Sequence, residues 1–385
     1  MRNATTSPVD HPGSFIVEEL EARGWSQADL AYILGKSAAQ VNPILTGKVS
    51  ISPDMATALG EAFDMPADFF ANLQKMYDLQ KAKRPDPGVR TRASWQAYFP
   101  VREMINRGWI EATEPGLLDL QMLRFFEKNR VEDIPFISDA PVVMGHAARK
   151  SSAYDAVTPI QYAWLHRVRK IALGMECPPY SKELLSNNLD QIRAHMLDIK
   201  DDLIRIPAIL GKAGVRLVFV ESLAGSKIDG VCLWLGDQPV IGMTLRLDRP
   251  DNFCFVLRHE IEHVLRGDGQ EEKFAPVDTF DGDYSDAASD DLPDCEKIAN
   301  AKAADFCVPK DLLDSFLARK GEFISERDVL NFAGRLAIHP AIVIGQIQHK
   351  RQRYNWLRKY QTSVRPFLLD WKFTDGWGST PPTGL

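Results

Sequence analysis

The sequence contains few cysteines, no long apolar run and no excess of basic residues. Its 385 residues include only five cysteines and no C-x-x-C pair, so we expect no disulfide framework and a reducing, cytoplasmic setting. No stretch of about 18 consecutive apolar residues occurs, and residues 1–15 lack the apolar core of a secretory signal, so we expect no membrane partner. The chain has 46 Lys and Arg residues and 52 Asp and Glu residues. The resulting net charge of −6 argues against a uniformly basic protein that coats nucleic acid.

The composition otherwise indicates a globular protein of more than one domain. Apolar residues make up 45% of the chain and charged residues 25%, which is typical of globular proteins. At roughly 150 residues per domain, the length predicts two or three domains.

The first 80 residues predict five short helices in a helix-turn-helix arrangement. Gly24 and Gly35 interrupt the apolar spacing, and Ser37 and Ser52 are suited to cap the helices that follow them. Pro53 occupies the first helical position, which proline prefers. A helix, a tight glycine turn and a second helix form the motif whose second helix can enter the major groove of DNA.

This segment resembles the DNA-binding domain of the HigA antitoxin and Xre-repressor families. The resemblance is carried by the run WSQADLAYILGKSAAQVNPILTGKVSISPDMATALGEAFDMPADFFANLQKMYDL, about a fifth of the chain. It implies double-stranded DNA as a partner and, by analogy with such regulators, a homodimer. By the same resemblance, phosphates would be contacted by Gln27, Lys36 and Lys48, and bases by Ser37, Ala39, Gln40 and Asn42.

Three features of this segment differ from those of a typical DNA-binding domain. Ala38 and Ala39 offer only methyl contacts at base-reading positions, and Pro43 removes a backbone donor from the second helix. Residues 1–90 hold 9 basic and 11 acidic side chains, so they lack the positive field that supports phosphate binding. A helical module for dimerisation or partner docking is therefore the other interpretation of this domain.

Residues 93–212 predict a helical middle region in which no residues have the spacing of a catalytic motif. After Gly214 the apolar residues no longer follow a helical period. The runs VRLVFVES, GVCLWLG and PVIGMTL are short, rich in Val, Leu and Phe, and separated by turn residues. They predict a small sheet of about three strands.

The stretch NFCFVLRHEIEHVLRG predicts an amphipathic helix that carries a metal site. His259 and His263 lie four residues apart and project from one helix face, where two imidazoles can bind one Zn²⁺. Glu260 lies beside them without being a ligand, which is the position of a general base. This is the H-E-x-x-H pattern of zinc metallopeptidases.

A catalytic zinc needs a third protein ligand, and a second helix, CEKIANAKAADFC, follows downstream. Together, FCFVLRHEIEHVLRG and EKIANAKAADFCVP resemble the ImmA/IrrE metallopeptidases over about residues 200–345. The resemblance implies that Glu296 is the third ligand, that Zn²⁺ is the cofactor, and that the protein substrate is a repressor or antitoxin. Glu260 would then act as the catalytic base for peptide hydrolysis.

Several neighbouring residues leave their roles open. Glu262 could bind a cation or be solvated, and solvation is the simpler interpretation. Oxidation of Cys295 could regulate zinc binding, or Cys295 could be a neighbouring thiol without a function. His339 could be the oxyanion donor or have a structural role. Seven acidic residues between Asp278 and Asp294, with no basic one, predict a mobile loop over the cleft.

The C-terminal run QIQHKRQRYNWLRKYQ interleaves basic and aromatic residues. It could stack on nucleic acid, but a solvated helix face docked by its aromatics is the favoured interpretation. The last residues, FTDGWGSTPPTGL, predict an extended tail.

These patterns predict a predominantly helical α+β protein with two competing functions. The predicted layout is a helix-turn-helix domain over 1–80, a linker over 81–92, a helical middle over 93–212, a zincin-like peptidase domain over 213–345, and a basic helix and tail over 346–385. The first hypothesis is a zinc-dependent metalloendopeptidase that regulates transcription by cleaving a repressor or antitoxin in a stress, phage or mobile-element response. The second is a non-proteolytic HigA-like antitoxin or regulator whose C-terminal domain senses a ligand or binds a partner.

Overall fold

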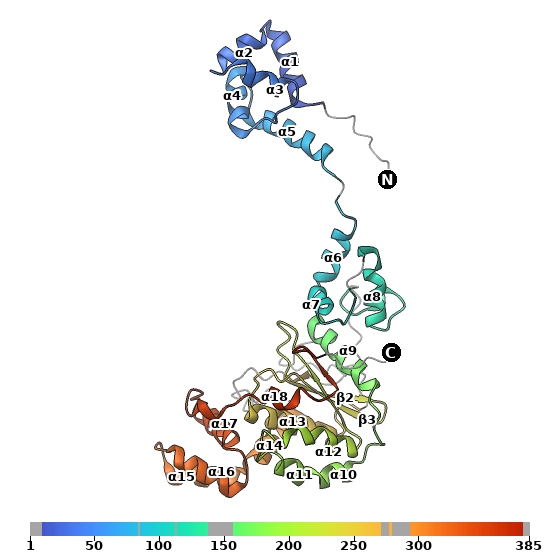
Figure 1. Cartoon of the computed structure of the whole chain (residues 1–385), viewed down its shortest axis with the longest axis vertical. Coiled ribbons are helices and arrows are strands. Elements are labelled where there is room, and N and C mark those ends of the chain that lie inside the picture. Colours follow the sequence, from blue (N-terminus) through green and yellow to red (C-terminus); the bar gives the residue numbers. More distant parts are fainter. Residues whose placement is uncertain are drawn as a thin grey trace. The chain divides into compact units, whose positions relative to one another are not determined.

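The computed structural model describes residues 10–83, 85–111, 114–137, 157–270, 277–278 and 293–379. The chain divides into two compact units, Met1–Asp86 and Pro87–Leu385 (Figure 1). Within the described residues, no helix is both long enough and apolar enough to cross a membrane.

The first unit contains the five predicted helices. They are α1 (Pro12–Arg23), α2 (Gln27–Ile33), α3 (Ala38–Leu45), α4 (Pro53–Phe63) and α5 (Ala67–Lys81). The Ser52 side chain accepts a hydrogen bond from the backbone of Met55 and so caps α4, as its position before Pro53 predicts. Ile16, Leu30 and Phe70, from three different helices, meet in one buried core. The helix-turn-helix fold predicted for this segment is present.

The first part of the second unit is helical, as expected for residues 93–212. Its α-helices are α6 (Gly88–Gln96), α7 (Val101–Asn106), α8 (Leu118–Phe125), α9 (Pro159–Leu173), α10 (Lys182–Asn187), α11 (Leu189–Ala194) and α12 (Ile206–Lys212). Short 3-10 turns lie at Pro115–Leu117 (η1), Val131–Asp133 (η2) and Leu203–Arg205 (η3). Thr158 and Gln161 form a reciprocal capping box at the start of α9, so this helix begins at a defined residue.

A mixed sheet lies at the centre of the second unit. Its strands are β1 (Arg216–Val220), β2 (Gly230–Leu235), β3 (Gln238–Met243), β4 (Val277–Asp278) and β5 (Thr374–Asp375), in the order β4-β2-β3-β1-β5. The first three are the predicted strands. β1 pairs in parallel with β3 and β5, whereas β2 pairs antiparallel with β3 and β4. The sheet therefore has five strands rather than the expected three. β4 and β5 were not predicted because strands of two residues are too short to show an alternating pattern.

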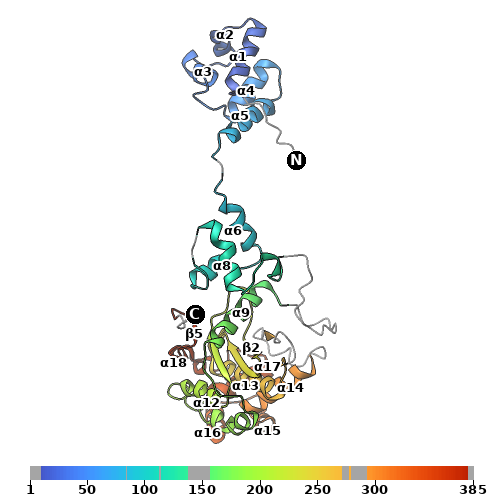
Figure 2. The ribbon, with the colours of Figure 1, turned by 90° about the vertical axis from the view of Figure 1, so that its right-hand side faces the viewer.

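Both faces of the sheet are covered. Leu217 and Phe219 of β1 belong to one buried cluster, and Val218 and Val220 belong to another, as the alternation of a strand requires. α9 packs against one face, and α13 (Pro250–Arg266) packs against the other (Figure 2). Burial on both faces explains why these strands are continuous apolar runs.

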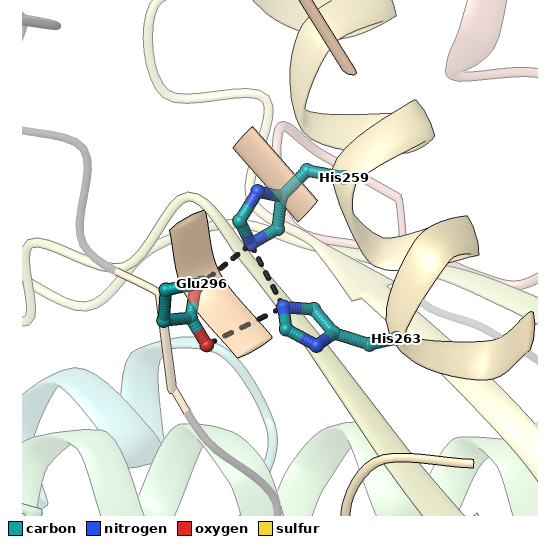
Figure 3. Close-up of side chains that lie close together, drawn as sticks. All are labelled: His259, His263 and Glu296. Atoms are coloured by element: carbon teal, nitrogen blue, oxygen red, sulfur yellow. Dashed lines mark hydrogen bonds and ion pairs between the residues drawn. The ribbon is translucent and has the colours of Figure 1, made fainter. Parts of the chain in front are cut away.

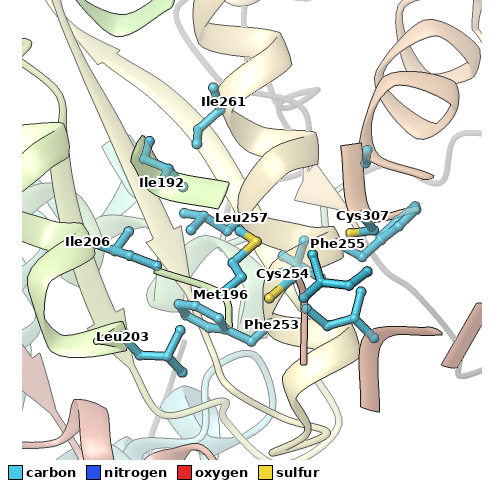
Figure 4. Packing of buried hydrophobic residues seen from close by; sticks show 14 of the residues in the cluster. Ile192, Met196, Leu203, Ile206, Phe253, Cys254, Phe255, Leu257, Ile261 and Cys307 are labelled. Atoms are coloured by element: carbon cyan, nitrogen blue, oxygen red, sulfur yellow. The ribbon is translucent and has the colours of Figure 1, made fainter. Parts of the chain in front are cut away.

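The helix α13 is the most buried helix of this unit and positions the candidate site. Its apolar face meets side chains such as Met196 and Leu203 through Phe253, Leu257 and Ile261 (Figure 4). The later helices are α14 (Asp294–Cys307), α15 (Lys310–Lys320), α16 (Glu326–Leu336), α17 (Pro340–Arg351) and α18 (Arg365–Leu368), with a 3-10 turn, η5, at Arg358–Tyr360. α14 and α17 pack against α13.

Thr374 and Asp375, near the C-terminus, form a strand of the sheet rather than part of a free tail. Asp375 forms an ion pair with Arg167 of α9, and both side chains are almost fully buried. The indole of Trp371 donates to the Leu217 carbonyl over 2.9 Å. The expectation of an extended tail was wrong for these residues because it did not account for a charged side chain paired in the core.

The basic and aromatic stretch that begins in α17 and continues past its end contacts the body of the same unit. Lys350 pairs with Asp314, and Lys359 pairs with Glu326 at 2.8 Å. The aromatic ring of Trp356 packs against the main buried cluster. These contacts agree with docking by the aromatic residues rather than with a surface for nucleic-acid stacking. The expectation of a helix was wrong beyond Arg351, where α17 ends and the chain continues in turns and η5.

Candidate metal centre and DNA-binding surface

Three predicted ligands converge in one buried cluster. His259 and His263 come from adjacent turns of α13, and Glu296 comes from the first turn of α14 (Figure 3). Nε2 of His259 lies 2.9 Å from Nε2 of His263 and 3.1 Å from Oε2 of Glu296, and His263 Nε2 lies 3.4 Å from Oε1 of Glu296. Both imidazoles have no solvent exposure, and Glu296 is 3% exposed.

The spacing of these donors fits a tetrahedral metal ion. Zinc–nitrogen and zinc–oxygen bonds of about 2.0–2.1 Å give tetrahedral ligand–ligand edges of about 3.3 Å. The distances between the two imidazole nitrogens and from each to one oxygen of Glu296 (Oε2 for His259, Oε1 for His263) scatter around that edge length. Two imidazole nitrogens and one carboxylate oxygen are also a zinc-preferred donor set that leaves a fourth position for water. The residues therefore fit Zn²⁺ in identity and in spacing.

The electrostatic surroundings keep Glu296 ionised. Burial by itself would raise the pKa of this carboxyl, but hydrogen bonding and positive charge from His259 and His263 outweigh it and hold the pKa below its usual range. An ionised carboxylate is the form that ligates a cation.

A fourth residue, Asp268, contacts one of the predicted ligands, His263. Its Oδ2 atom lies 2.9 Å from Nδ1 of His263, and its backbone carbonyl accepts a hydrogen bond from the indole of Trp234 over 2.9 Å. When Nδ1–H donates to this carboxylate, the Nε2 lone pair of His263 points to the metal position. Sequence reasoning missed Asp268; its only signal is an acid directly after Gly267, which ends α13 in the left-handed conformation.

The predicted base, Glu260, is fully buried and directly follows His259 on α13. It packs against β2 at Gly230, where a Cβ atom would lie 2.2 Å from its Oε1. Glycine is therefore required at this strand position for the carboxylate to keep its place. Sequence reasoning did not single out Gly230.

The structure bears on three nearby residues whose roles the sequence left open. Glu262 is buried and paired with Arg258 at 2.7 Å, so the solvated interpretation was wrong: the guanidinium compensates its charge within the protein. Cys295 Sγ lies 3.9 Å from Oε1 of Glu296, as their adjacency predicts. His339 caps α17, its Nδ1 accepting from the Ala341 backbone over 3.3 Å, which is the structural alternative to an oxyanion donor. The predicted loop over the cleft falls largely on residues 279–292, outside the described residues.

On the first unit, the side chains predicted to contact DNA share one property: all are exposed. They are Gln27 on α2, Lys36 and Ser37 in the turn, Ala39, Gln40 and Asn42 on α3, and Lys48 after it. Ser37 and Gln40 also form a capping box, in which Gln40 Oε1 accepts from the Ser37 backbone over 3.0 Å. α3 continues through Pro43 to Leu45, so the proline does not end the helix.

Comparison with known families concerns the first unit. A family model described as helix-turn-helix matches residues 16–70. The N-terminal domain belongs to the helix-turn-helix family. The matched segment includes α2, α3 and all seven predicted contact residues, and it ends well before the metal centre.

Solved helix-turn-helix proteins are similar to this domain in sequence. A structure of PA4674 from Pseudomonas aeruginosa in complex with its 18 bp operator DNA is 44% identical, covering 18% of this chain and 76% of that chain, with a TM-score of 0.18. The Pseudomonas aeruginosa antitoxin HigA with the higBA promoter is 42% identical, covering 19% and 80%, with a TM-score of 0.19. Antitoxin GraA is 37% identical, covering 20% and 84%, with a TM-score of 0.20. No curated protein matches the chain.

Proposed function

We propose that this protein is a DNA-binding regulator of the HigA antitoxin type. The observation that carries the proposal is 42–44% sequence identity with helix-turn-helix proteins whose structures contain operator or promoter DNA. The exposed side chains on α2 and α3 support it, because an exposed second helix is what enters the major groove. The regulator would act on double-stranded DNA near its own promoter.

The test is binding of the full-length protein to its own promoter fragment, measured by fluorescence anisotropy at several salt concentrations. A Gln40→Ala/Asn42→Ala double variant should lose preference for that fragment over random DNA. Lys75→Ala, an exposed change on α5, serves as the matched control and should leave the preference intact. Equal affinity of the wild type for promoter and random DNA would refute a specific regulator.

For the second unit, we propose a zinc centre that hydrolyses a peptide bond in a repressor or antitoxin. The proposal is supported by the buried His259–His263–Glu296 cluster and by its H-E-x-x-H resemblance to the ImmA/IrrE metallopeptidases. When bound there, Zn²⁺ supplies Lewis acidity, which activates water and polarises a carbonyl group. His259, His263 and Glu296 would hold the ion.

The remaining chemistry belongs to protein side chains. Glu260, which is buried and follows His259 on α13, would accept a proton from the attacking water and pass it to the leaving amine. Asp268 keeps His263 in one orientation, so the donor set stays aligned during the reaction.

A sensor or partner-binding role of the second unit is the other candidate, and one experiment separates the two. Bound zinc is measured in the purified protein, and the wild type and Glu260→Ala are compared for cleavage of the repressor or antitoxin encoded beside it. Zinc near one per chain with cleavage only by the wild type supports the peptidase. Zinc well below one per chain refutes the metal site, and zinc without cleavage by either protein favours the regulator alone.

A further inference from the structure

The basic residues of the first unit are concentrated at the end of α5. Residues 1–90 hold nine Lys and Arg residues, and five of these lie at positions 75–90, where only two acidic residues occur. A DNA-binding domain needs positive charge where it meets the phosphates, and the rest of this segment has an excess of acids. What the end of α5 can bind therefore depends on where it lies relative to α3, the helix proposed to enter the major groove.

A series of side-chain contacts connects the end of α5 to the turn after α3. Nζ of Lys81 lies 4.2 Å from the ring centroid of Tyr77, one helical turn earlier. The ring of Tyr77 meets the imidazole of His11 edge to face, with centroids 4.7 Å apart. His11 packs against Gly47, where a Cβ atom would lie 2.9 Å from His11 Cγ. Each step from Lys81 to Gly47 is a direct contact, and the next residue in the chain is Lys48.

The start of α1 lies against the end of α3 and fixes this arrangement. A Cβ atom on Gly13 would be 2.4 Å from the carbonyl oxygen of Leu45, so the first turn of α1 touches the backbone of α3. His11 caps α1 by accepting from the Gly13 backbone over 2.9 Å, so its ring has a fixed place at this turn. The end of α3, the start of α1 and the end of α5 therefore meet at one corner of the first unit.

The lysines near this corner are available to an anion. Lys48, Lys81 and Lys83 are exposed, and none of them forms an ion pair with a carboxylate within the described part of the chain. Asp78, the acid nearest to Lys81 in sequence, accepts a hydrogen bond from Gln74 over 2.9 Å instead. Exposed ammonium groups without a carboxylate partner can neutralise the phosphates of a nearby duplex.

We propose that Lys81 and Lys83 bind DNA phosphates beside the phosphate assigned to Lys48, so that the end of α5 extends the DNA-binding surface beyond the helix-turn-helix motif. This inference rests on the proposed DNA-binding function of the first unit. A lysine acts on a phosphate as a point charge and reads no base, so these contacts should strengthen binding to every DNA sequence alike. The stacking of Lys81 on Tyr77 places its ammonium group before DNA binds, which lowers the ordering cost of the contact.

The experiment is fluorescence anisotropy of the full-length protein with its promoter fragment and with random DNA, between about 50 and 200 mM salt. Lys81→Ala and Lys83→Ala should each lower the slope of log affinity against log salt by about one, on both DNAs. The double variant should lower the slope by about two. The ratio of promoter affinity to random-DNA affinity should equal that of the wild type in all three variants.

Two further variants test the placement of the contact. Lys75→Ala removes another exposed ammonium group from α5, on the side that lines a groove with Pro53 and Leu79, and it should keep the wild-type slope. Lys81→Arg retains the positive charge and should also keep that slope. Each variant is first shown by circular dichroism to melt as the wild type does.

The outcomes for this inference and for the proposed function are separate. Unchanged slopes for Lys81→Ala and Lys83→Ala would overturn the inference, and so would an equal decrease for Lys75→Ala, because the effect would then be one of total charge. A wild type without preference for its promoter would refute the specific regulator, whereas the slopes on random DNA would still decide the role of the two lysines. A wild type that binds neither DNA would overturn both.

Discussion

Gly230 of β2 lies directly against the carboxylate of Glu260 on α13. A Cβ atom at Gly230 would be 2.2 Å from Glu260 Oε1 and 2.8 Å from Cγ1 of Val256. Gly230, the first residue of β2, and the proposed base Glu260 are therefore in direct contact. A larger side chain at either position would displace the other.

Gly230→Ala should therefore impair hydrolysis without removing the metal. The added methyl group displaces Glu260, and a misplacement of about 1 Å costs on the order of a hundredfold in rate. The zinc ligands come from α13 and α14, so bound zinc should stay near the wild-type amount. Single-turnover cleavage and metal analysis check both parts, with Gly334→Ala as control because its Cβ would meet nothing within 4 Å. Unchanged cleavage by Gly230→Ala would contradict the role given to Glu260.

Asp268→Asn should weaken zinc binding by roughly 10–100-fold, the usual effect of removing a carboxylate that orients a ligand histidine. The 2.9 Å contact with Nδ1 fixes His263, and an amide no longer supplies the same negative acceptor. Competition with a zinc chelator measures the affinity. Asp311→Asn, an exposed change on α15, is the matched control. Equal zinc affinity of the two variants would show that Asp268 does not orient the ligand.

Gln40→Glu should separate the two roles of Gln40. Glutamate at this position can still accept from the Ser37 backbone, so the capping box and the stability of the first unit should persist. The lost amide donor should reduce discrimination between promoter and random DNA by about 1–3 kcal/mol. Anisotropy with both DNAs measures the difference, and thermal melting checks the cap.

Lys48→Ala should weaken binding to both DNAs alike. A lysine that neutralises one phosphate contributes about one to the slope of log affinity against log salt. A slope lower by about one, with the preference for the promoter unchanged, is the expected result. If the slope does not change, Lys48 does not contact a phosphate.

Acidification should destabilise the second unit through His166. Burial among Phe125, Phe126 and Tyr162 lowers the pKa of His166 from 6.5 to about 4. Between these values the unfolded chain binds a proton that the folded protein does not, so the free energy of unfolding falls as the pH falls. The loss amounts to roughly 3 kcal/mol by pH 4. Urea unfolding from pH 7 to 4 should show this loss in the wild type and a smaller one in His166→Leu.

Asp375→Ala should destabilise the second unit by about 3–5 kcal/mol, because it leaves Arg167 buried without its partner. Asp370→Ala, an exposed change five residues earlier, should stay within about 0.5 kcal/mol of the wild type. Urea unfolding measures both. A small effect of Asp375→Ala would mean that β5 is not held by this pair.

The parts of the structure that the sequence predicted are those encoded by local pattern. Caps and glycine stops at Gly24 and Ser52 mark the first helices, and the four-residue spacing of His259 and His263 places both on one face of α13. Apolar runs likewise predicted β1, β2 and β3, because each is long enough to be recognised.

The contacts that local pattern does not encode were missed. Gly230 lies thirty residues before Glu260, and nothing in its neighbourhood indicates that a carboxylate packs on it. Asp375 reaches Arg167 across 208 positions of sequence, and β5 has only two residues. The Arg258–Glu262 pair was missed for another reason: its four-residue spacing on α13 is visible in the sequence, but composition favoured water as the partner of Glu262.

The pairing of β5 with β1 has a consequence for synthesis on the ribosome. The helix-turn-helix unit is complete within Met1–Asp86, so it can fold while the rest of the chain is still being made. The sheet against which α13 packs is complete only when Thr374 and Asp375 have left the exit tunnel. A nascent chain can therefore have a folded helix-turn-helix unit for most of its synthesis before the sheet beneath the His259–His263–Glu296 cluster is complete.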